Sequence, residues 1–325
     1  MNRRVLLRGL GGVLAWPLGA LAQQPSRNYR VCWLSSLAPK TESYNATLVQ
    51  RLRDLGFVEG RNLVIEYRSA EGKIERLGPL AADLARQDCD AIFAPGTEAN
   101  LLAIKKVTHD TPIVVVATDY DPVATGHVAS LARPGGRITG VSHLQSELPA
   151  KRMELLKNFL PGARKIAVLS DVVSTDQLAL TQAAAARLGL TLVVHEFKRA
   201  PYGYEQAFAE FGHAKPDALL TLASGLFVSA RKTIPALALR HRLPSMFNNR
   251  LWAENGGLLS YGVNFAVTYR RAAEQLAMIL NGAKPAETPM EQAAAVEFVI
   301  NLKTAKALGV AIPPSMLARA DEVIQ

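Results

Sequence analysis

The sequence predicts an α/β protein of two similar lobes, each a parallel sheet flanked by helices. Short apolar runs alternate with stretches of helical periodicity along the chain, which is typical of parallel α/β structure. The same order of pieces occurs twice, starting near residues 30 and 165. The length of 325 residues also suits two domains.

The first half contains five expected strands, each a short apolar run with polar or small residues at its end. A helix with leucines on one face and Gly56 as its stop signal follows the first strand. Further helices are expected at 77–86 and from Thr97, which suits a helix cap. The expected strands are 30–36, 63–67, 90–96, 112–117 and 138–142.

The second half repeats this order, and a tail follows it. Helices are expected at 181–188 and 204–211, between strands at 165–171, 191–197, 217–222, 244–247 and 257–261. The tail has a helix at 267–280, an extended stretch at 295–300, a helix ending at Leu308 and a last helix at 315–323. We expect the tail to cross back between the lobes. This gives 29–143 plus 257–284 as lobe 1, and 144–256 plus 285–325 as lobe 2.

The first 22 residues have the pattern of a signal peptide cleaved after Ala22. Arg3, Arg4 and Arg8 form a basic start, an apolar segment follows, and small residues stand at the cleavage point. A short buried N-terminal helix is the alternative. The pattern predicts secretion by the general route or, because of the paired arginines, by the twin-arginine route.

The formal net charge of +9 does not indicate a nucleic-acid-binding protein. Three of these charges belong to the signal segment, and the other basic residues are scattered without interleaved aromatics. No later stretch is long and apolar enough to span a membrane, so we expect a soluble mature protein. A monomer is the default expectation. Secretion permits a disulfide between Cys32 and Cys89, but two buried thiols are the interpretation that we favour.

The motifs of common α/β enzymes are absent from the sequence. It has no G-x-S-x-G elbow, no P-loop and no G-x-G-x-x-G after the first strand. The six histidines are isolated, so the sequence predicts no metal site. A secreted α/β enzyme with a catalytic pair from distant positions is one alternative function.

Polar residues at the carboxyl ends of the expected strands are the candidate ligand-binding residues. Ligands of parallel sheets bind beyond these ends, and two facing lobes form a cleft there. We expect a ligand carboxylate at the helix start at Thr97 and a ligand amine at Asp119 or Asp121. The alternatives are that Thr97 only caps its helix and Asp121 only shapes a turn. The candidates are Ser35, Ser36, Gly96, Thr97, Thr118, Asp119, Asp121, Ser142, Asp171, Ser224, Asn248 and Tyr261.

A series of short motifs runs through the chain in a fixed order. They are LGFVEGRN at 55–62, IEYR at 65–68, AEG at 70–72, DPV at 121–123, SLARPGG at 130–136, ITG at 138–140, KRMELLK at 151–157, GGLLSYG at 256–262 and VINLKTAK at 299–306. Together they resemble the family of ABC-transporter substrate-binding proteins that includes tryptophan- and tyrosine-type uptake proteins. The resemblance covers essentially the whole chain.

The resemblance implies a type I periplasmic-binding fold, with two lobes joined by three crossover segments. It implies a periplasmic protein without catalysis or cofactor that binds a small molecule, such as an amino acid or an aromatic or related carboxylate. The implied partners are an inner-membrane permease and its ATPase. A periplasmic sensing module that reports to a membrane receptor is the alternative.

Two segments at the expected pocket depart from the family pattern. The segment 117–120 lacks the glycine that commonly precedes the aspartate, and Ser224-Gly225 replaces an Asp-Pro pair. The ligand therefore need not be the family's aromatic amino acid. Tyr120 and Phe227 are further candidates for stacking on a flat ligand.

Overall fold

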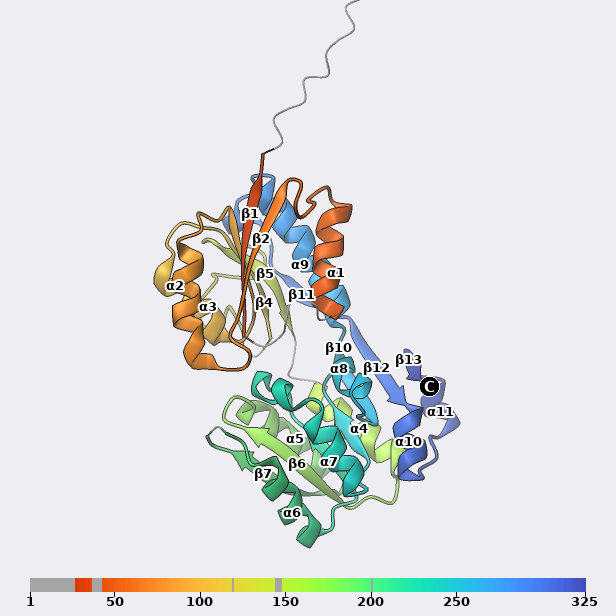
Figure 1. Cartoon of the computed structure of the whole chain (residues 1–325). Helices are drawn as coiled ribbons and strands as arrows, with labels where there is room; N and C mark the ends of the chain where they lie inside the picture. Colours follow the sequence, from red (N-terminus) through yellow and green to blue (C-terminus); the bar gives the residue numbers. More distant parts are fainter. Residues whose placement is uncertain (1–26, 37–42, 119, 144–147, 200) are drawn as a thin grey trace, which may run out of the picture.

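The structure, a computed structural model, describes residues 27–36, 43–118, 120–143, 148–199 and 201–325. They form two lobes, each built on one sheet with helices on both faces (Figure 1). The expected signal segment and the candidate Asp119 lie outside the described residues.

The first lobe contains a parallel sheet whose central strands are buried along their length. In sheet order its strands are β11 (Glu291–Ala293), β5 (Ile138–His143), β4 (Ile113–Ala117), β3 (Ala91–Gly96), β1 (Tyr29–Ser35) and β2 (Leu63–Ser69). One face carries α1 (Ser43–Asp54) and α9 (Phe265–Leu280), and the other carries α2 (Leu77–Ala85) and α3 (Glu98–Val107) (Figure 1). Burial on both faces explains why these strands are continuous apolar runs.

The second lobe contains a mixed sheet. In sheet order its strands are β13 (Glu322–Ile324), β12 (Val296–Asn301), β10 (Leu259–Val263), β9 (Ser245–Phe247), β8 (Ala218–Thr221), β6 (Lys165–Asp171) and β7 (Thr191–Phe197). Among these seven described strands, only β10 and β12 pair antiparallel. Its helices are α4 (Leu148–Phe159), α5 (Thr175–Arg187), α6 (Tyr204–Ala214), α7 (Thr233–Arg240), α8 (Arg250–Glu254), α10 (Leu302–Leu308) and α11 (Pro314–Leu317). A 3₁₀ turn at Gly225–Ala230 belongs to this lobe. Two further 3₁₀ turns lie elsewhere in the chain, at Ile74–Arg76 and Pro285–Glu287.

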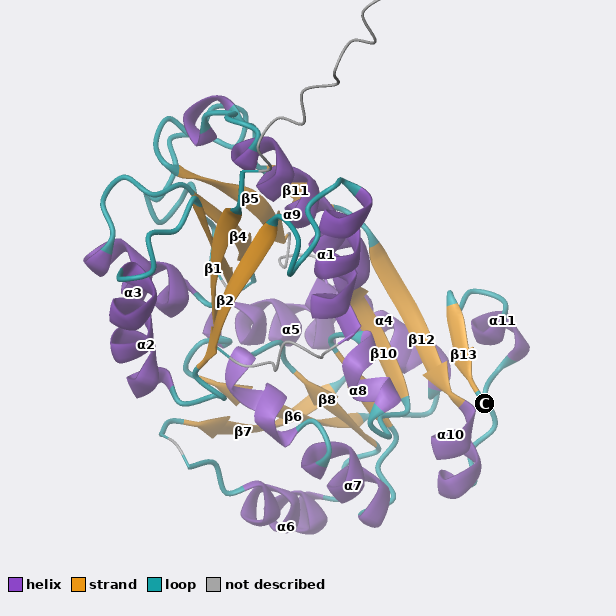
Figure 2. Cartoon of the chain, turned by 45° about the horizontal axis from the view of Figure 1, so that its top comes forward, coloured by secondary structure: helices purple, strands orange, loops and turns teal. Residues whose placement is uncertain are grey.

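The predicted fold class is confirmed, and from residue 27 onward the described elements alternate between the lobes with three passages. The passages lie between β5 and α4, between β10 and α9, and between β11 and β12. Figure 2 shows β10 and β12 side by side where the lobes meet. Such a triple connection allows the lobes to rotate about a hinge while each sheet stays intact.

The tail differs from the sequence-based expectation in two places. The expected strand at 257–261 was assigned to lobe 1, but β10 pairs with β9 and β12 in the sheet of lobe 2. Lobe 1 contains α9, as expected, and also receives β11, which was expected in lobe 2, so the second and third passages fall after Val263 and Ala293. The expected helix at 315–323 is also wrong. α11 stops at Leu317, and β13 pairs with β12, because sheet pairing outweighs local helix propensity.

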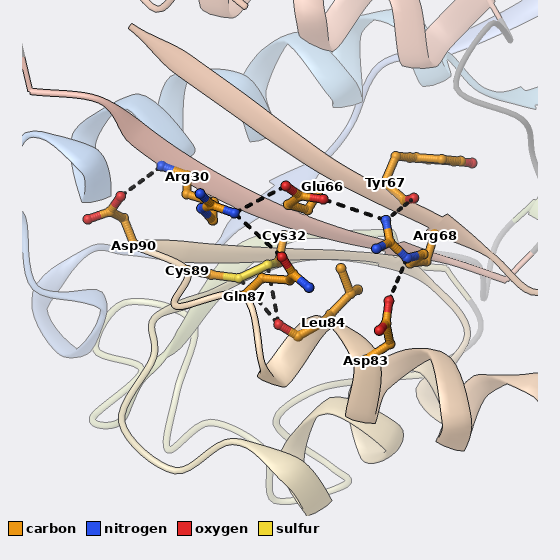
Figure 3. Close-up of a disulfide and its surroundings, with 10 residues drawn as sticks. All are labelled: Arg30, Cys32, Glu66, Tyr67, Arg68, Asp83, Leu84, Gln87, Cys89 and Asp90. Carbon is orange, nitrogen blue, oxygen red and sulfur yellow. Dashed lines mark hydrogen bonds and ion pairs between the residues drawn. A yellow bond between two sulfur atoms is a disulfide. The ribbon is translucent and has the colours of Figure 1, made fainter.

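The two cysteines are joined in a disulfide, which corrects the expectation of two free thiols (Figure 3). Cys32 lies in β1 and Cys89 follows α2, 57 residues later in the sequence. Packing of α2 against β1 brings their Cα atoms to 5.8 Å, within the usual range for a disulfide. The sequence separation gave no sign of this approach.

A buried carboxylate lies at the hinge. Glu297 in β12 is 7% exposed, and its Oε2 accepts a hydrogen bond at 3.1 Å from Nδ2 of Asn264, which precedes α9. Burial, together with the nearby Glu322, raises the pKa of Glu297 to about 7. The guanidinium of Arg250 acts in the opposite direction, but it is shared with Glu322 and Glu254.

Replacing Glu297 with glutamine is expected to stabilise the protein above pH 7. The folded protein keeps a proton on Glu297 up to about pH 7, whereas the unfolded chain loses it near the ordinary value of 4.5. Stability therefore falls as pH rises between these two values, by about 1–3 kcal/mol, and glutamine removes this fall. Urea unfolding of both proteins at pH 5 and pH 8 measures this change in the free energy of unfolding. Exposed Glu287→Gln is the control, and an equal pH dependence in both variants would refute the assignment.

Candidate functional site

The carboxyl ends of the strands in both lobes meet at a cleft. The first lobe contributes the ends of β1, β3 and β4 and the starts of α1, α3 and α9, and the second contributes segments after β8 and β9. The lining residues are Ser35, Ser36, Tyr44, Pro95, Gly96, Thr97, Thr118, Ala223, Ser224, Gly225, Val228, Asn248, Asn249, Leu251, Phe265 and Tyr269.

One wall of the cleft is the start of α3. Thr97 occupies the N-cap position with an extended backbone, but its side chain makes no capping hydrogen bond, contrary to expectation. The first N–H groups of this ten-residue helix therefore lack the usual side-chain acceptor. Within the described chain, the buried Oγ1 of Thr97 also has no partner. These donors and the helix dipole favour a carboxylate at this wall.

The backbone beside this wall is fixed by close packing. Gly96 has φ +110°, and a Cβ there would lie 2.9 Å from Ser36 Oγ. Buried Asn100 in α3 donates from Nδ2 to the carbonyl oxygens of Leu34 at 3.3 Å and Pro95 at 2.6 Å. The ends of β1 and β3 are thereby tied to α3, so the anion-favouring wall is formed without a ligand.

The opposite wall carries a hydroxyl backed by a buried carboxylate. Ser224 Oγ donates to Asp171 Oδ2 and accepts from the Leu226 N–H at 3.0 Å. Asp171 is 0% exposed, and the Tyr202 hydroxyl donates to the same Oδ2 at 3.4 Å. Burial raises the pKa of Asp171, and these hydrogen bonds oppose the rise.

The charge on Asp171 has no cationic partner among the described residues. Because Ser224 already uses its proton, it offers the cleft an acceptor lone pair. Asn248 adds a second acceptor, since its buried Oδ1 has no partner in the described part of the chain. This wall therefore favours a hydrogen-bond donor with positive charge.

Packing holds the main chain of Asn248 in place. A Cβ on Gly262 would lie 1.7 Å from the Asn248 carbonyl oxygen, so only glycine permits this approach. The next residue, Asn249, has a separate role. Its Oδ1 accepts from the Leu251 N–H at 3.1 Å and caps α8.

Aromatic rings form the third side of the cleft. Tyr44 lies 5.7 Å from Phe265 and 4.9 Å from Tyr269 between ring centroids. Phe265 and Tyr269 are four residues apart at the start of α9, so they lie on one face of the helix. Burial raises the pKa of Tyr269 well above its ordinary value, which keeps its hydroxyl protonated. A flat apolar group fits against such rings.

A second hollow adjoins the cleft, and Thr118 lines both. Asp121, Ser142, His143 and Tyr120 lie around it, together with residues of α5. The Asp121 carboxylate accepts from the N–H groups of Val123 at 2.8 Å and Ala124 at 3.2 Å. Its carboxylate therefore shapes a turn, which is the alternative role that the sequence left open.

The structure brings seven of the twelve sequence candidates together in the cleft: Ser35, Ser36, Gly96, Thr97, Thr118, Ser224 and Asn248. Asp121 and Ser142 lie in the second hollow, and Asp171 lies behind Ser224. Tyr261 lines a separate hollow near α4, and its carbonyl accepts from Arg152 Nε at 2.7 Å. The expectation that Phe227 faces a ligand is wrong, because it is buried against Phe197 in the core of lobe 2.

The aromatic side is what sequence reasoning missed. The helix was expected to start at 267, but Asn264 Oδ1 accepts from the Val267 N–H at 3.0 Å and caps a helix that starts at Phe265. An asparagine followed by Phe265 and Tyr269 at helical spacing was the available signal. No sequence signal pointed to Tyr44, because its position in the cleft depends on the packing of α1 against α9.

Among the described residues there is neither a cluster of metal-binding side chains nor a membrane-spanning helix. No three His, Cys, Asp or Glu side chains of that part of the chain gather as a metal site. No helix found there has the length and apolarity needed to cross a bilayer.

Comparisons with known proteins give a consistent result. A family model described as ABC transporter substrate binding protein matches residues 40–324. A tyrosine-binding protein of Clostridioides difficile (strain R20291) is 26% identical over 273 residues, which are 83% of this chain and 77% of that protein. A conserved domain protein of Vibrio cholerae is 25% identical, with a TM-score of 0.81 over 91% of this chain and 100% of its own. An ABC domain of Streptococcus pneumonia in complex with L-Trp is 24% identical, with a TM-score of 0.78 over the same shares.

Proposed function

The chain belongs to the family of ABC transporter substrate-binding proteins, and from this premise we propose that it captures an aromatic amino acid between its lobes for import. The choice of an aromatic amino acid as the ligand is based on one observation. A wall that favours an anion, a wall that favours a cation and an aromatic side meet in a single cleft. A free amino acid with an aromatic side chain has all three matching groups.

The proposed orientation of the ligand follows from the walls. Its carboxylate lies at the start of α3, near Thr97, and its ammonium group lies at Ser224 and Asn248, with Asp171 behind. Its ring packs against Phe265 and its neighbours. This replaces the earlier expectation of an amine at Asp119 or Asp121.

The role in the cell is proposed on the same basis. The basic, apolar and small-residue pattern of residues 1–22 supports export to the periplasm. There the protein, as a monomer, delivers its ligand to an inner-membrane permease and its ATPase. The tyrosine-binding relative supports an amino acid as the cargo. The cleft acts by binding and closing, and the proposal includes no catalytic step.

Thermal unfolding with a ligand panel tests this function. The panel holds the natural amino acids, with tyramine and 3-(4-hydroxyphenyl)propionate as tyrosine analogues that lack one charged group each. A ligand at about 100 times its Kd adds about 2.7 kcal/mol of stability. We expect an aromatic amino acid to give the largest rise in Tm, and each analogue much less. A larger rise with a sugar or an aliphatic amino acid would contradict the proposal.

A further inference from the structure

We propose that His143 is the residue that selects a ring hydroxyl on the ligand, so that the preferred ligand is a phenol such as tyrosine and not its unsubstituted analogue. The inference rests on the proposed function and deepens it. His143 is a polar side chain that does not line the cleft itself.

His143 is buried without a partner. It is 8% exposed, and within the described chain neither of its ring nitrogens has a hydrogen-bond partner. A buried polar group without a hydrogen-bond partner costs folding free energy. When such a group lies in a binding region, a hydrogen bond from the ligand can satisfy it. Burial also lowers the pKa of His143 to about 4, which keeps the ring neutral at physiological pH.

The position of His143 connects it to the aromatic side of the cleft. Val141 and His143 are two residues apart in β5, so they point to the same face of the sheet, where α9 packs. The His143 ring centroid lies 5.4 Å from that of Phe265, which lines the cleft. His143 itself lines the second hollow, and Thr118 lines both spaces. Thr118 and the contact between the rings of His143 and Phe265 thus connect the aromatic side of the cleft to the hollow that His143 lines.

The hydrogen-bonding chemistry of a neutral imidazole indicates which ligand group suits His143. One ring nitrogen donates and the other accepts. A hydroxyl can pair with whichever ring nitrogen faces it, whereas a carboxylate pairs only with the N–H and an ammonium group only with the bare nitrogen. The apolar side chains of Val123, Leu131 and Leu180 also line the hollow, which suits a neutral group on an aromatic ring.

Titration calorimetry with L-tyrosine and L-phenylalanine tests the proposal, because these ligands differ by one hydroxyl. We expect the unaltered protein to bind tyrosine at least 10-fold more tightly, since a site that hydrogen-bonds a hydroxyl rejects the analogue without it. In His143→Phe the ratio should fall close to one, through weaker tyrosine binding. His143→Asn, which keeps a donor and an acceptor, should retain part of the preference. Thr97→Val is the matched control, since it should weaken both ligands equally.

The nitrogen-15 shifts of the imidazole provide a readout that needs no variant. They should change on addition of tyrosine and stay constant on addition of phenylalanine. Equal affinities in the unaltered protein, or an unchanged ratio in His143→Phe, would overturn the role of His143 while leaving aromatic amino acid binding intact. Failure to bind either ligand would overturn both the role of His143 and the proposed ligand class.

Discussion

Replacing Asp171 with asparagine is expected to weaken the binding of an aromatic amino acid by roughly 10- to 100-fold. Asparagine keeps one oxygen that accepts from Ser224 Oγ, and its amide nitrogen takes the place of Oδ1, which accepts from the Val173 N–H at 3.2 Å. The wall therefore loses its charge and one weak backbone hydrogen bond. A hydrogen bond that involves a charged group contributes about 1.5–3 kcal/mol, which corresponds to this range. Calorimetry should show the loss for tyrosine and little change for 3-(4-hydroxyphenyl)propionate, which has no ammonium group.

The control for this prediction is Asp217→Asn. Asp217 belongs to the same lobe, but it lies at the opposite end of the sheet, where its Oδ2 accepts from the N–H groups of Arg164 at 2.8 Å and Lys165 at 2.9 Å. The two variants change the net charge equally, so an equal loss of affinity in both would mean that the charge on Asp171 does not act on the ligand.

The dependence of binding on pH provides a second check of Asp171. Burial raises the pKa of its carboxyl group in the free protein. An ammonium group nearby favours the charged form and lowers the pKa again. Affinity should therefore fall as pH drops through the pKa of the free protein, with proton release on binding near that pH. Asp171→Asn should lose this dependence.

The sequence predicted which residues line the cleft better than it predicted their contacts. Gly96, Thr97, Ser224 and Asn248 were recognised because each follows an apolar strand, and parallel strands end at one edge. Whether a polar side chain faces the ligand or its own backbone depends on contacts that strand spacing does not show. The Asp121 carboxylate, for example, accepts hydrogen bonds from the backbone N–H groups of Val123 and Ala124.

The arrangement of the tail depended on contacts between elements that are far apart in the sequence. β10 looked like the last strand of another five-strand unit, yet its place was decided by pairing with β9 and β12. The disulfide was hidden for the same reason, since Cys32 and Cys89 meet only after α2 packs on β1. Local pattern predicts each element, and long-range packing decides its neighbours.

Replacing Phe265 with alanine is expected to have the second large effect, a loss of about 2–3 kcal/mol in the binding of an aromatic amino acid. The ligand loses the apolar contact area of the ring and the preferred geometry between aromatic rings. Phe265→Leu keeps most of the apolar volume, so it should cost only about 0.5–1.5 kcal/mol. Calorimetry on both variants separates the two contributions.

Phe57→Ala is the matched control for Phe265. Phe57 is 5% exposed, lies in the same lobe and packs edge-on against Tyr29, at the amino end of the sheet and away from the cleft. Its loss should lower the free energy of unfolding by about 3–5 kcal/mol and leave affinity unchanged. If Phe265→Ala lowered stability in the same way without weakening tyrosine binding, the ring would belong to the core of lobe 1 alone. The ligand ring would then need another place in the cleft, and the proposed contact between His143 and a ring hydroxyl would lose its geometric basis.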